Sequence, residues 1–425
     1  MNNQSIVRSP RGTKDILPDD SVYWKYIEII ARNTLSTYSY REIRTPLFEE
    51  TTLFKRGIGE GTDIVNKEMY TFLDQAQREL TLRPEGTAGV VRAFIEKQMF
   101  QAKAINRLWY QGPMFRYERP QSGRQRQFHQ LGVELLGSDN SLADAEVISV
   151  ALDILKSLNV EDVTLEINSI GDFHERQHYL TALKEFLNEY KQDLDPDSLS
   201  KLEINPLRIL DTKNTKTKEI LLGAPILKTY LNSYSQQHFE SLLCYLTEIG
   251  IDYKVNNRLV RGLDYYTYTA FEIKAKHLGA QDTICGGGRY NHLVKQLQGP
   301  NTPAVGWGMG LERLILLLNQ PLLEKSTDVD FYIANVDNET SFLALKTAQG
   351  LRQLGFTTEL DITYARLQKQ LKRATKINAR GVIILGLKEL QNNFGTIKWL
   401  KSGNQSEFPL SNLSVIKKLY LQASI

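Results

Sequence analysis

Apolar and polar positions recur along the chain with two different periods, and these periods predict its helices and strands. Apolar residues spaced three and four apart predict amphipathic helices at 21–38 and 142–158. Asp19 or Asp20 is placed to cap the first helix. Runs rich in β-branched and aromatic residues predict strands at 40–46, 80–83, 108–111, 114–117, 128–136, 255–273 and 283–285. A turn at 84–87 precedes a helix near Ala88, and a strand at 304–310 runs into a helix at 311–318.

The composition and the predicted secondary structure change twice along the chain, and these changes predict its division into domains. Between 172 and 254 it becomes helix-like and rich in lysine and leucine, which predicts an insertion into the surrounding fold. A linker is predicted at 321–327. Beyond it, strands at 331–336, 357–360, 382–385 and 397–400 alternate with helices at 339–354 and 364–378. This alternation predicts a small α/β domain. The expected division is 1–171 with 255–326, an insertion at 172–254, and a separate domain at 327–425.

Composition places the chain among ordinary globular proteins. Its 425 residues are enough for two or three domains, with 41% hydrophobic and 24% charged residues. No apolar run approaches the length of a membrane span, and the first residues lack the apolar segment of a secretory signal. Two cysteines are too few for a disulfide framework or a cysteine-rich zinc site. We therefore expect a cytoplasmic protein without a membrane segment.

Charge is unevenly distributed along the chain. Residues 327–425 hold 13 Lys and Arg against 8 Asp and Glu, whereas the remaining residues hold 39 against 41. Within the basic part, five cations recur at spacings of three and four and predict one helical stripe: Arg366, Lys369, Arg373, Lys376 and Arg380. Such a stripe suits a nucleic-acid backbone, and a solvated helix face accounts for it equally well.

A hairpin with an arginine-rich mouth is predicted at 114–130. Its cations are Arg116, Arg119, Arg124 and Arg126. Because arginine matches phosphate oxygens with two parallel hydrogen bonds, the mouth is a candidate grip for a nucleoside triphosphate. A solvated hairpin face is the plainer alternative. The chain has no G-x-x-x-x-G-K-[ST] phosphate loop, so any ATP has to be held by arginines and metal.

Two further groups of residues are candidates for a ligand pocket. Gln130, Gly132 and Glu134 share one face of the returning strand because strand side chains alternate. The run 261–272, which we predict as strand, pairs Arg261 with aromatic residues that carry polar tips. That pairing suits an anionic, flat, hydrogen-bonding ligand, although an exposed strand with snorkelling ends is equally compatible. Glu85 lies where a strand gives way to a helix, and there it either meets an ammonium group or complements the helix dipole.

Two motifs invite a wrong assignment. Gly306, Gly308 and Gly310 do not have the spacing of a dinucleotide fingerprint, and no βαβ unit surrounds them. Residues 174–178, HERQH, match the zinc motif H-E-x-x-H, but they lie in the polar insertion without a third histidine. We interpret them as surface helix and predict no dedicated metal site.

Six segments in order along nearly the whole chain resemble those of bacterial-type histidyl-tRNA synthetases, which are class II aminoacyl-tRNA synthetases. Residues 11–15 resemble the family's opening signature, and 40–49 with Pro46 its dimer-interface motif. Residues 115–118 and 308–313 resemble the two class II ATP motifs. Residues 259–272 and 286–308 resemble two histidine-specific signatures.

The resemblance implies an α+β fold and a role for individual residues. The fold is an antiparallel sheet with flanking helices, a helical insertion and a C-terminal α/β anticodon-binding domain. Arg116 and Arg261 are implied as catalytic residues. Histidine is implied to meet Glu85, Thr87, Gln130, Glu134, Arg261, Tyr265 and Tyr266, and ATP to meet Arg116, Glu118, Phe128 and Arg313. The tRNA is implied to meet Arg366, Lys369, Arg373 and Lys376.

The implied activity is the ATP-dependent ligation of histidine to tRNA(His). Histidine, ATP with Mg²⁺, and the tRNA are the implied substrates and partners, and the chain is implied to act as a homodimer. A pocket that hydrogen-bonds both imidazole nitrogens discriminates against other amino acids by roughly 10⁴–10⁵, so no editing domain is needed.

Some residues depart from the family pattern, and one related protein class has another function. Tyr268 stands where glycine is common, and Asn291, His292 and Gln298 replace commoner residues. These departures put loop packing in question more than chemistry. The alternative is the synthetase-like regulatory subunit of ATP phosphoribosyltransferase, which lacks aminoacylation activity and typically lacks the anticodon domain. The basic residues 327–425 favour the enzyme.

Overall fold

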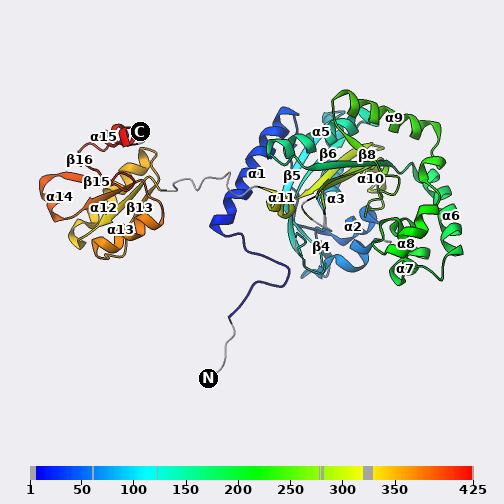
Figure 1. Cartoon of the computed structure of the whole chain (residues 1–425), viewed down its shortest axis with the longest axis horizontal. Helices are drawn as coiled ribbons and strands as arrows, with labels where there is room; N and C mark the ends of the chain where they lie inside the picture. The colour runs from blue at the N-terminus through cyan, green and yellow to red at the C-terminus, as the bar shows by residue number, and fades with distance from the viewer. Residues whose placement is uncertain are drawn as a thin grey trace, which may run out of the picture. The chain divides into compact units, whose positions relative to one another are not determined.

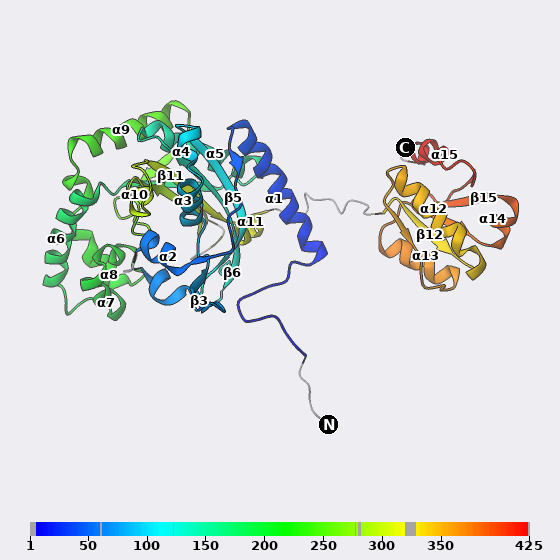
Figure 2. The same ribbon diagram turned by 180° about the vertical axis from the view of Figure 1, so that it is seen from behind.

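The chain folds into two compact units, Met1–Leu318 and Asn319–Ile425. The computed structural model in Figures 1 and 2 describes residues 6–423 except 60, 61, 122, 277, 279–281 and 319–328. The linker predicted at 321–327 lies outside the described residues. Each unit has hydrophobic clusters of its own, so each is described by itself.

The first unit is built on a sheet of eight strands in the order β1-β5-β6-β11-β10-β9-β7-β8. Only the pairs β1–β5 and β7–β8 at its two edges are parallel, and the others are antiparallel. The strands are β1 (Arg41–Glu42), β5 (Asn106–Phe115), β6 (Gln127–Leu136), β7 (Val163–Ser169), β8 (Tyr253–Val255), β9 (Thr267–Ala275), β10 (Thr283–Arg289) and β11 (Ala304–Gly310). The predicted antiparallel α+β core is confirmed.

One face of this sheet is closed by long helices. They are α1 (Pro18–Thr37), α5 (Ser141–Ser157), α9 (Ser233–Glu248) and α11 (Leu311–Leu317). Their apolar sides share a cluster with Leu131, Val133 and Trp307 of β6 and β11. Since strand side chains alternate, Gln130, Gly132 and Glu134 face the opposite side of the sheet, together with Gly306 and Gly308. Alternate side chains of β6 and β11 therefore point to the hydrophobic core on one face of the sheet and to the candidate site on the other.

The opposite face is bordered by shorter elements and by the insertion. A small sheet, in the order β2-β4-β3, consists of β2 (Phe48–Glu50), β3 (Tyr70–Leu73) and β4 (Glu79–Leu82). The helices α2 (Thr51–Ile58), α3 (Thr87–Glu96), α4 (Met99–Ala102) and α10 (Leu293–Gln296) accompany it. Helices α6 (Phe173–Glu189), α7 (Pro196–Ile204) and α8 (Thr215–Ile220) of the insertion gather on the side of this unit away from α1 (Figures 1 and 2).

The second unit has one five-stranded sheet, ordered β13-β12-β14-β15-β16. Its strands are β12 (Phe331–Asn335), β13 (Thr358–Leu360), β14 (Gly381–Leu385), β15 (Phe394–Trp399) and β16 (Gln405–Pro409). Its helices are α12 (Ser341–Gln353), α13 (Leu367–Lys376), α14 (Leu387–Asn392) and α15 (Val415–Ala423). The sequence patterns predicted α12, α13 and the first four strands, but not β16, α14 or α15.

Several predicted elements of the first unit differ from the structure. The segments 108–111 and 114–117 form one strand, β5, because Gly112 and Pro113 remain paired with β6. Leu17 precedes the first helical residue of α1, and Asp19 and Asp20 lie in its first turn, so neither aspartate is the cap. Residues 256–266 form a loop, and β9 starts only at Thr267. The predicted domain boundary at 254 falls inside β8, whose partner in the sheet is β7.

Candidate active site

A cavity of about 190 Å³ opens on the sheet face opposite α1 and α5. Its wall includes Glu85, Thr87, Arg116, Glu118, Phe128, Gln130, Arg261, Tyr265, Tyr266 and Arg313. These residues come from the segment after β5, from β6, the start of α3, the loop before β9 and the start of α11, and they lie far apart in the sequence. Every residue that sequence analysis assigned to histidine or ATP lines this cavity except Glu134, which lies buried behind Thr87.

Glycines in the central strands make room for the polar side chains. A Cβ atom on Gly306 would lie 1.9 Å from Oε2 of Glu134, and one on Gly308 would lie 2.1 Å from Nε2 of Gln130. A Cβ atom on Gly286 would lie 2.2 Å from Nη2 of Arg261. Because these distances are far below van der Waals contact, any side chain at these positions would displace a group of the site.

Glu134 is the most enclosed charge-bearing group of the site. It is 0% exposed and accepts hydrogen bonds from the hydroxyls of Thr87 (2.7 Å) and Tyr290. Burial raises the pKa of Glu134 to about 8, because an ionised carboxylate is poorly stabilised away from water. A carboxyl group that keeps its proton can donate a hydrogen bond as well as accept one.

Glu85 caps helix α3 and also lines the cavity. Its oxygens accept from the backbone N–H groups of Thr87 (2.6 Å) and Ala88 (2.8 Å), so the helix-start role considered for it is present. Burial raises the pKa of Glu85 above its ordinary value. The carboxyl group therefore lies at the cavity wall with its geometry fixed by two backbone bonds.

Arg116 and Arg313 are held by backbone carbonyls at the cavity wall. Nε of Arg116 donates to the carbonyl oxygen of Pro84 at 2.8 Å, and its guanidinium lies 5.3 Å from the ring centre of Phe128. Nη1 of Arg313 donates to the carbonyl oxygen of Thr283 at 2.5 Å. Arg116 also lies 3.9 Å from the carboxylate of Glu118, and both guanidinium groups line the cavity, where arginine can match the oxygens of an anionic ligand. Arg124, also at the wall, forms an ion pair with Glu118 at 2.6 Å.

The remaining predicted mouth arginines lie differently. Arg119 is exposed and absent from the cavity wall, and the guanidinium of Arg126 stacks 3.9 Å from the ring centre of Tyr117. The mouth therefore contributes Arg116 and Arg124 to the cavity rather than all four cations.

Arg261 reaches the cavity from the loop before β9. Its Nη1 pairs with Glu272, and its Nε is buried with no hydrogen-bond partner within the described part of the chain. An unpaired buried donor is costly unless a ligand satisfies it. Arg261 is thus oriented by one carboxylate and keeps a donor for an incoming anion.

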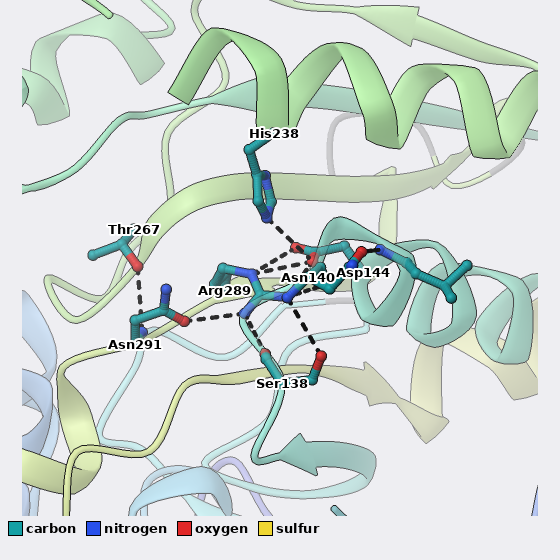
Figure 3. A network of polar contacts seen from close by, with 8 residues as sticks. Ser138, Asn140, Asp144, His238, Thr267, Arg289 and Asn291 are labelled. Atoms are coloured by element: carbon teal, nitrogen blue, oxygen red, sulfur yellow. Dashed lines mark hydrogen bonds and ion pairs between the residues drawn. The ribbon is translucent and has the colours of Figure 1, made fainter. Parts of the chain in front are cut away.

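Arg289 joins the ends of three strands of the large sheet (Figure 3). The guanidinium is fully buried, pairs with Asp144 of α5, and donates to the carbonyl oxygens of Ser138 (2.7 Å) and Asn140 (3.0 Å).

The guanidinium of Arg289 also donates to Asn291, whose backbone N–H donates to the hydroxyl of Thr267 at 3.3 Å. His238 of α9 lies 3.7 Å from the same Asp144 carboxylate. These contacts tie together the ends of β6, β9 and β10.

Sequence reasoning missed three residues of this region. Tyr290 supports Glu134, Tyr110 lines the cavity, and Arg289 joins the strand ends. Their positions next to or opposite glycines in the sheet could have identified these residues. Arg289 and Tyr290 directly follow three glycines of β10, and Tyr110 lies opposite Gly132, where a Cβ atom would be 2.1 Å from its ring.

The H-E-x-x-H segment has a structural role in the insertion. Glu175 is buried in a capping box with Asp172 and accepts from the hydroxyl of Ser235 at 2.7 Å and from the backbone N–H of Asn232. His174 and His178 are exposed. Among the described residues no group of three or more His, Cys, Asp or Glu side chains is arranged to hold a metal ion.

The basic stripe of the second unit lies mainly on α13. Lys369 and Lys376 are exposed, and Arg366 precedes the first helical residue. Arg373 forms an ion pair with Asp361 at 2.8 Å, so part of its charge is compensated within the fold. Arg366, Lys369, Lys372 and Arg373 border a surface hollow of about 510 Å³.

Comparison with known proteins identifies the family. The family described as "Histidyl-tRNA synthetase" matches residues 12–314, and the family described as "Anticodon binding domain" matches residues 330–419. A histidine–tRNA ligase of Cyanothece sp. strain PCC 7425 is 54% identical, over 96% of this chain and 95% of the relative. One from Acaryochloris marina is 53% identical with the same coverage.

A solved structure extends the similarity to three dimensions. The crystal structure of apo Staphylococcus aureus histidyl-tRNA synthetase has a TM-score of 0.80 and 36% identity, and the match covers 98% of this chain and 100% of that one. No helix among the described residues is long and apolar enough to cross a membrane. From sequence family, fold and coverage together, the chain belongs to the histidyl-tRNA synthetases, the ATP-dependent enzymes that ligate histidine to tRNA.

Proposed function

We propose that the cavity on the sheet face of the first unit is where histidine is activated with ATP, and that residues 327–425 bind the anticodon part of tRNA(His). The observation that carries the proposal is the cavity wall itself. The wall carries two arginines, Arg116 and Arg313, and a buried carboxyl group suited to an imidazole, that of Glu134, lies behind the wall residue Thr87. A nucleotide and a histidine side chain require these two environments.

Histidine is held by its imidazole and its α-amino group in this proposal. Glu134 and Tyr266 bracket the ring, while Glu85, Thr87 and Gln130 meet the ammonium group and Tyr265 closes the wall. Support comes from the buried oxygen Oε1 of Gln130, which has no partner within the described residues and faces the same cavity. A wrong amino acid would leave these buried polar groups unsatisfied, which is how such sites discriminate.

ATP is held by Arg116, Glu118, Phe128 and Arg313. The ring of Phe128 offers a stacking surface for adenine, and the two arginines match phosphate oxygens. The carboxylates of Glu118 and Glu312 lie at the same wall, and Mg²⁺ is commonly bound by one or two carboxylates together with substrate phosphates. The residues therefore fit a metal that arrives with ATP, and Mg²⁺ would neutralise phosphate charge there.

Activation then needs no side-chain nucleophile. The carboxylate of histidine attacks the α-phosphorus, the bond to the β,γ-diphosphate breaks, and histidyl-adenylate and pyrophosphate result. Arg261, with a donor left over, is placed to stabilise the negative charge that develops on the α-phosphoryl oxygens. A ribose hydroxyl at the tRNA 3′-end next attacks the acyl carbon and displaces AMP.

The test is histidine-dependent exchange of labelled pyrophosphate into ATP. We expect exchange with histidine and Mg²⁺, and none with the other amino acids or without metal. A folded sample that binds histidine but exchanges no pyrophosphate would support the regulatory-subunit alternative. The match of residues 330–419 to an anticodon-binding domain argues against that alternative.

The assembly and compartment are further parts of the proposal. Exposed apolar side chains gather around the segment that resembles the dimer motif: Leu47, Phe48, Phe72 and Leu73. Such a surface favours a homodimer, and light scattering coupled to gel filtration would report its mass. We also propose a cytoplasmic location, supported by the two unpaired cysteines; imaging of a tagged chain tests it.

A further inference from the structure

The first turn of the insertion reaches the proposed histidine pocket through a single long side chain. Arg176 of α6 is partly buried, and its Nη1 donates to the backbone carbonyl oxygen of Tyr266 at 2.6 Å. A charged donor on a carbonyl is among the stronger hydrogen bonds of a protein. The contact fixes the main chain of a residue whose side chain lines the cavity.

The loop that carries Tyr265 and Tyr266 packs into a hydrophobic cluster through these two side chains, and it also borders empty space. A second cavity, of about 390 Å³, lies between this loop and the insertion and shares the wall residues Arg261, Leu263 and Tyr265 with the first cavity. Because the loop borders empty space on two sides, polar contacts of its main chain add to the packing of its side chains in fixing its position.

The insertion supplies these polar contacts. Besides Arg176, Asn205 donates from Nδ2 to Asp264 at 3.3 Å. At the root of the insertion, the backbone N–H of Tyr268 donates to the carbonyl oxygen of Gly171 at 2.8 Å, and that of Ile170 to the carbonyl oxygen of Tyr268 at 2.7 Å. The root and the loop are therefore joined on both sides of Tyr266.

Tyr268 strengthens this junction through its side chain. Its φ of 51° lies in the left-handed region that favours glycine, at an irregularity in the pairing of β9 with β10. Its ring lies 5.5 Å from that of His238 and 5.8 Å from that of Tyr234, both on α9. Packing against the insertion thus offsets an unfavourable backbone conformation two residues after Tyr266.

We propose that Arg176 is a positioning residue for histidine: it acts from the insertion, through the carbonyl of Tyr266, on the pocket that receives the imidazole. The inference rests on the proposed function of the cavity. It extends the role of the insertion, which sequence reasoning had left without any chemistry, to substrate selection.

The test compares three full-length variants in histidine-dependent ATP–pyrophosphate exchange. Arg176→Met removes the hydrogen bond and keeps the apolar stem, and we expect the KM for histidine to rise about tenfold. The kcat and the KM for ATP should stay within about twofold, because the arginines at the phosphate side are untouched. Arg176→Lys should restore the KM for histidine to within about threefold of the wild type, because an ammonium group can still donate to the carbonyl.

Arg258→Met is the matched control. Arg258 also donates across the boundary with the insertion, but to the carbonyl oxygen of Leu221, at 3.3 Å and outside the cavity wall. We expect no change in the KM for histidine. An equal rise in Arg258→Met, a parallel rise in both KM values, or an unchanged Arg176→Met would overturn the proposal.

Two further measurements keep the outcomes separate. If Arg176→Met fails to fold, Asn205→Ala removes the milder contact, and a KM for histidine that does not rise by about twofold or more rejects the proposal. Wild-type protein without any histidine-dependent exchange contradicts the proposed function itself, whereas an active wild type with unaffected variants contradicts only the role of Arg176.

Discussion

The charged groups that we assign to ligands lie in opposite surroundings in the two units. In the first unit Glu134 is 0% exposed and Arg261 keeps a buried, unpaired donor, whereas in the second unit Lys369 and Lys376 are exposed to solvent. Electrostatic interactions are strong and specific where water is excluded, and weak and screened where it is not. A small substrate is therefore matched by a few enclosed charges, and a long polyanion by many exposed ones.

The largest expected effect tests the enclosed side of this comparison. Arg261→Met should lower the kcat of ATP–pyrophosphate exchange by about 10²–10³-fold, because a preorganised cation opposite the developing charge is lost. The Kd for histidine, measured by calorimetry, should change much less. Arg119→Met is the control, since Arg119 is exposed and absent from the cavity wall. Equal losses in both variants would remove the special role of the enclosed arginine.

Removing the second unit tests whether histidine activation and tRNA recognition depend on different parts of the chain. A chain ending at Leu318 keeps the clusters that form the core of the first unit. We expect its pyrophosphate exchange to stay within about twofold, while charging of tRNA falls by about 100-fold or more as a second binding module is lost. Full charging by the shortened chain would show that residues 327–425 do not take part in recognition.

The raised pKa of Glu134 should make the stability of the folded protein depend on pH. Because burial raises it to about 8, the folded protein keeps a proton that the unfolded chain loses near its ordinary value of 4.5. The wild type should therefore lose stability as pH rises from about 5 to about 8. Glu134→Gln carries no titrating proton, so its Tm relative to wild type, without histidine, should climb by roughly 5–8 °C over that range. A constant difference in Tm would mean that Glu134 is ionised throughout.

The smallest expected effect belongs to the exposed side. Lys369→Glu and Lys376→Glu should each weaken tRNA binding modestly and reduce the slope of log K against log salt by about one per lost phosphate contact. Lys346→Glu in α12 is the comparison variant outside the stripe. Slopes that match the wild type would show the stripe to be solvated surface.

Arg373→Met should instead destabilise the second unit, because the carboxylate of Asp361 loses its ion-pair partner.

Sequence patterns predicted those parts of the site that lie on regular elements. Gln130 and Glu134 were placed on one face by the period of two, and β6 and β11 confirm that period with Leu131, Val133 and Trp307 in the core. Strand, turn and helix around Glu85 were likewise located within a residue or two. Local patterning was sufficient there because each face of these elements meets a single environment.

The loop at 256–266 shows what local patterning cannot give. Its aromatic residues favour strand, yet Tyr265 and Tyr266 are both buried, and both line the cavity. A strand would send them to opposite faces. Contacts that help to hold this conformation come from Asn205 and Arg176, which lie 59 and 90 residues away from their partners in the sequence, and no local window contains them. The same holds for Arg289, whose partners Ser138 and Asp144 lie some 150 residues away.

Few amino-acid substitutions should be tolerated in strand β11. Its odd-numbered positions, Val305, Trp307 and Met309, are large and buried, while Gly306 and Gly308 between them lie against the side chains of Glu134 and Gln130. A smaller residue at the first set opens a cavity in the core, and a larger one at the second set displaces Glu134 or Gln130. In a saturation-mutagenesis library this strand would form an unbroken intolerant block, with loss of folding and loss of activity alternating residue by residue.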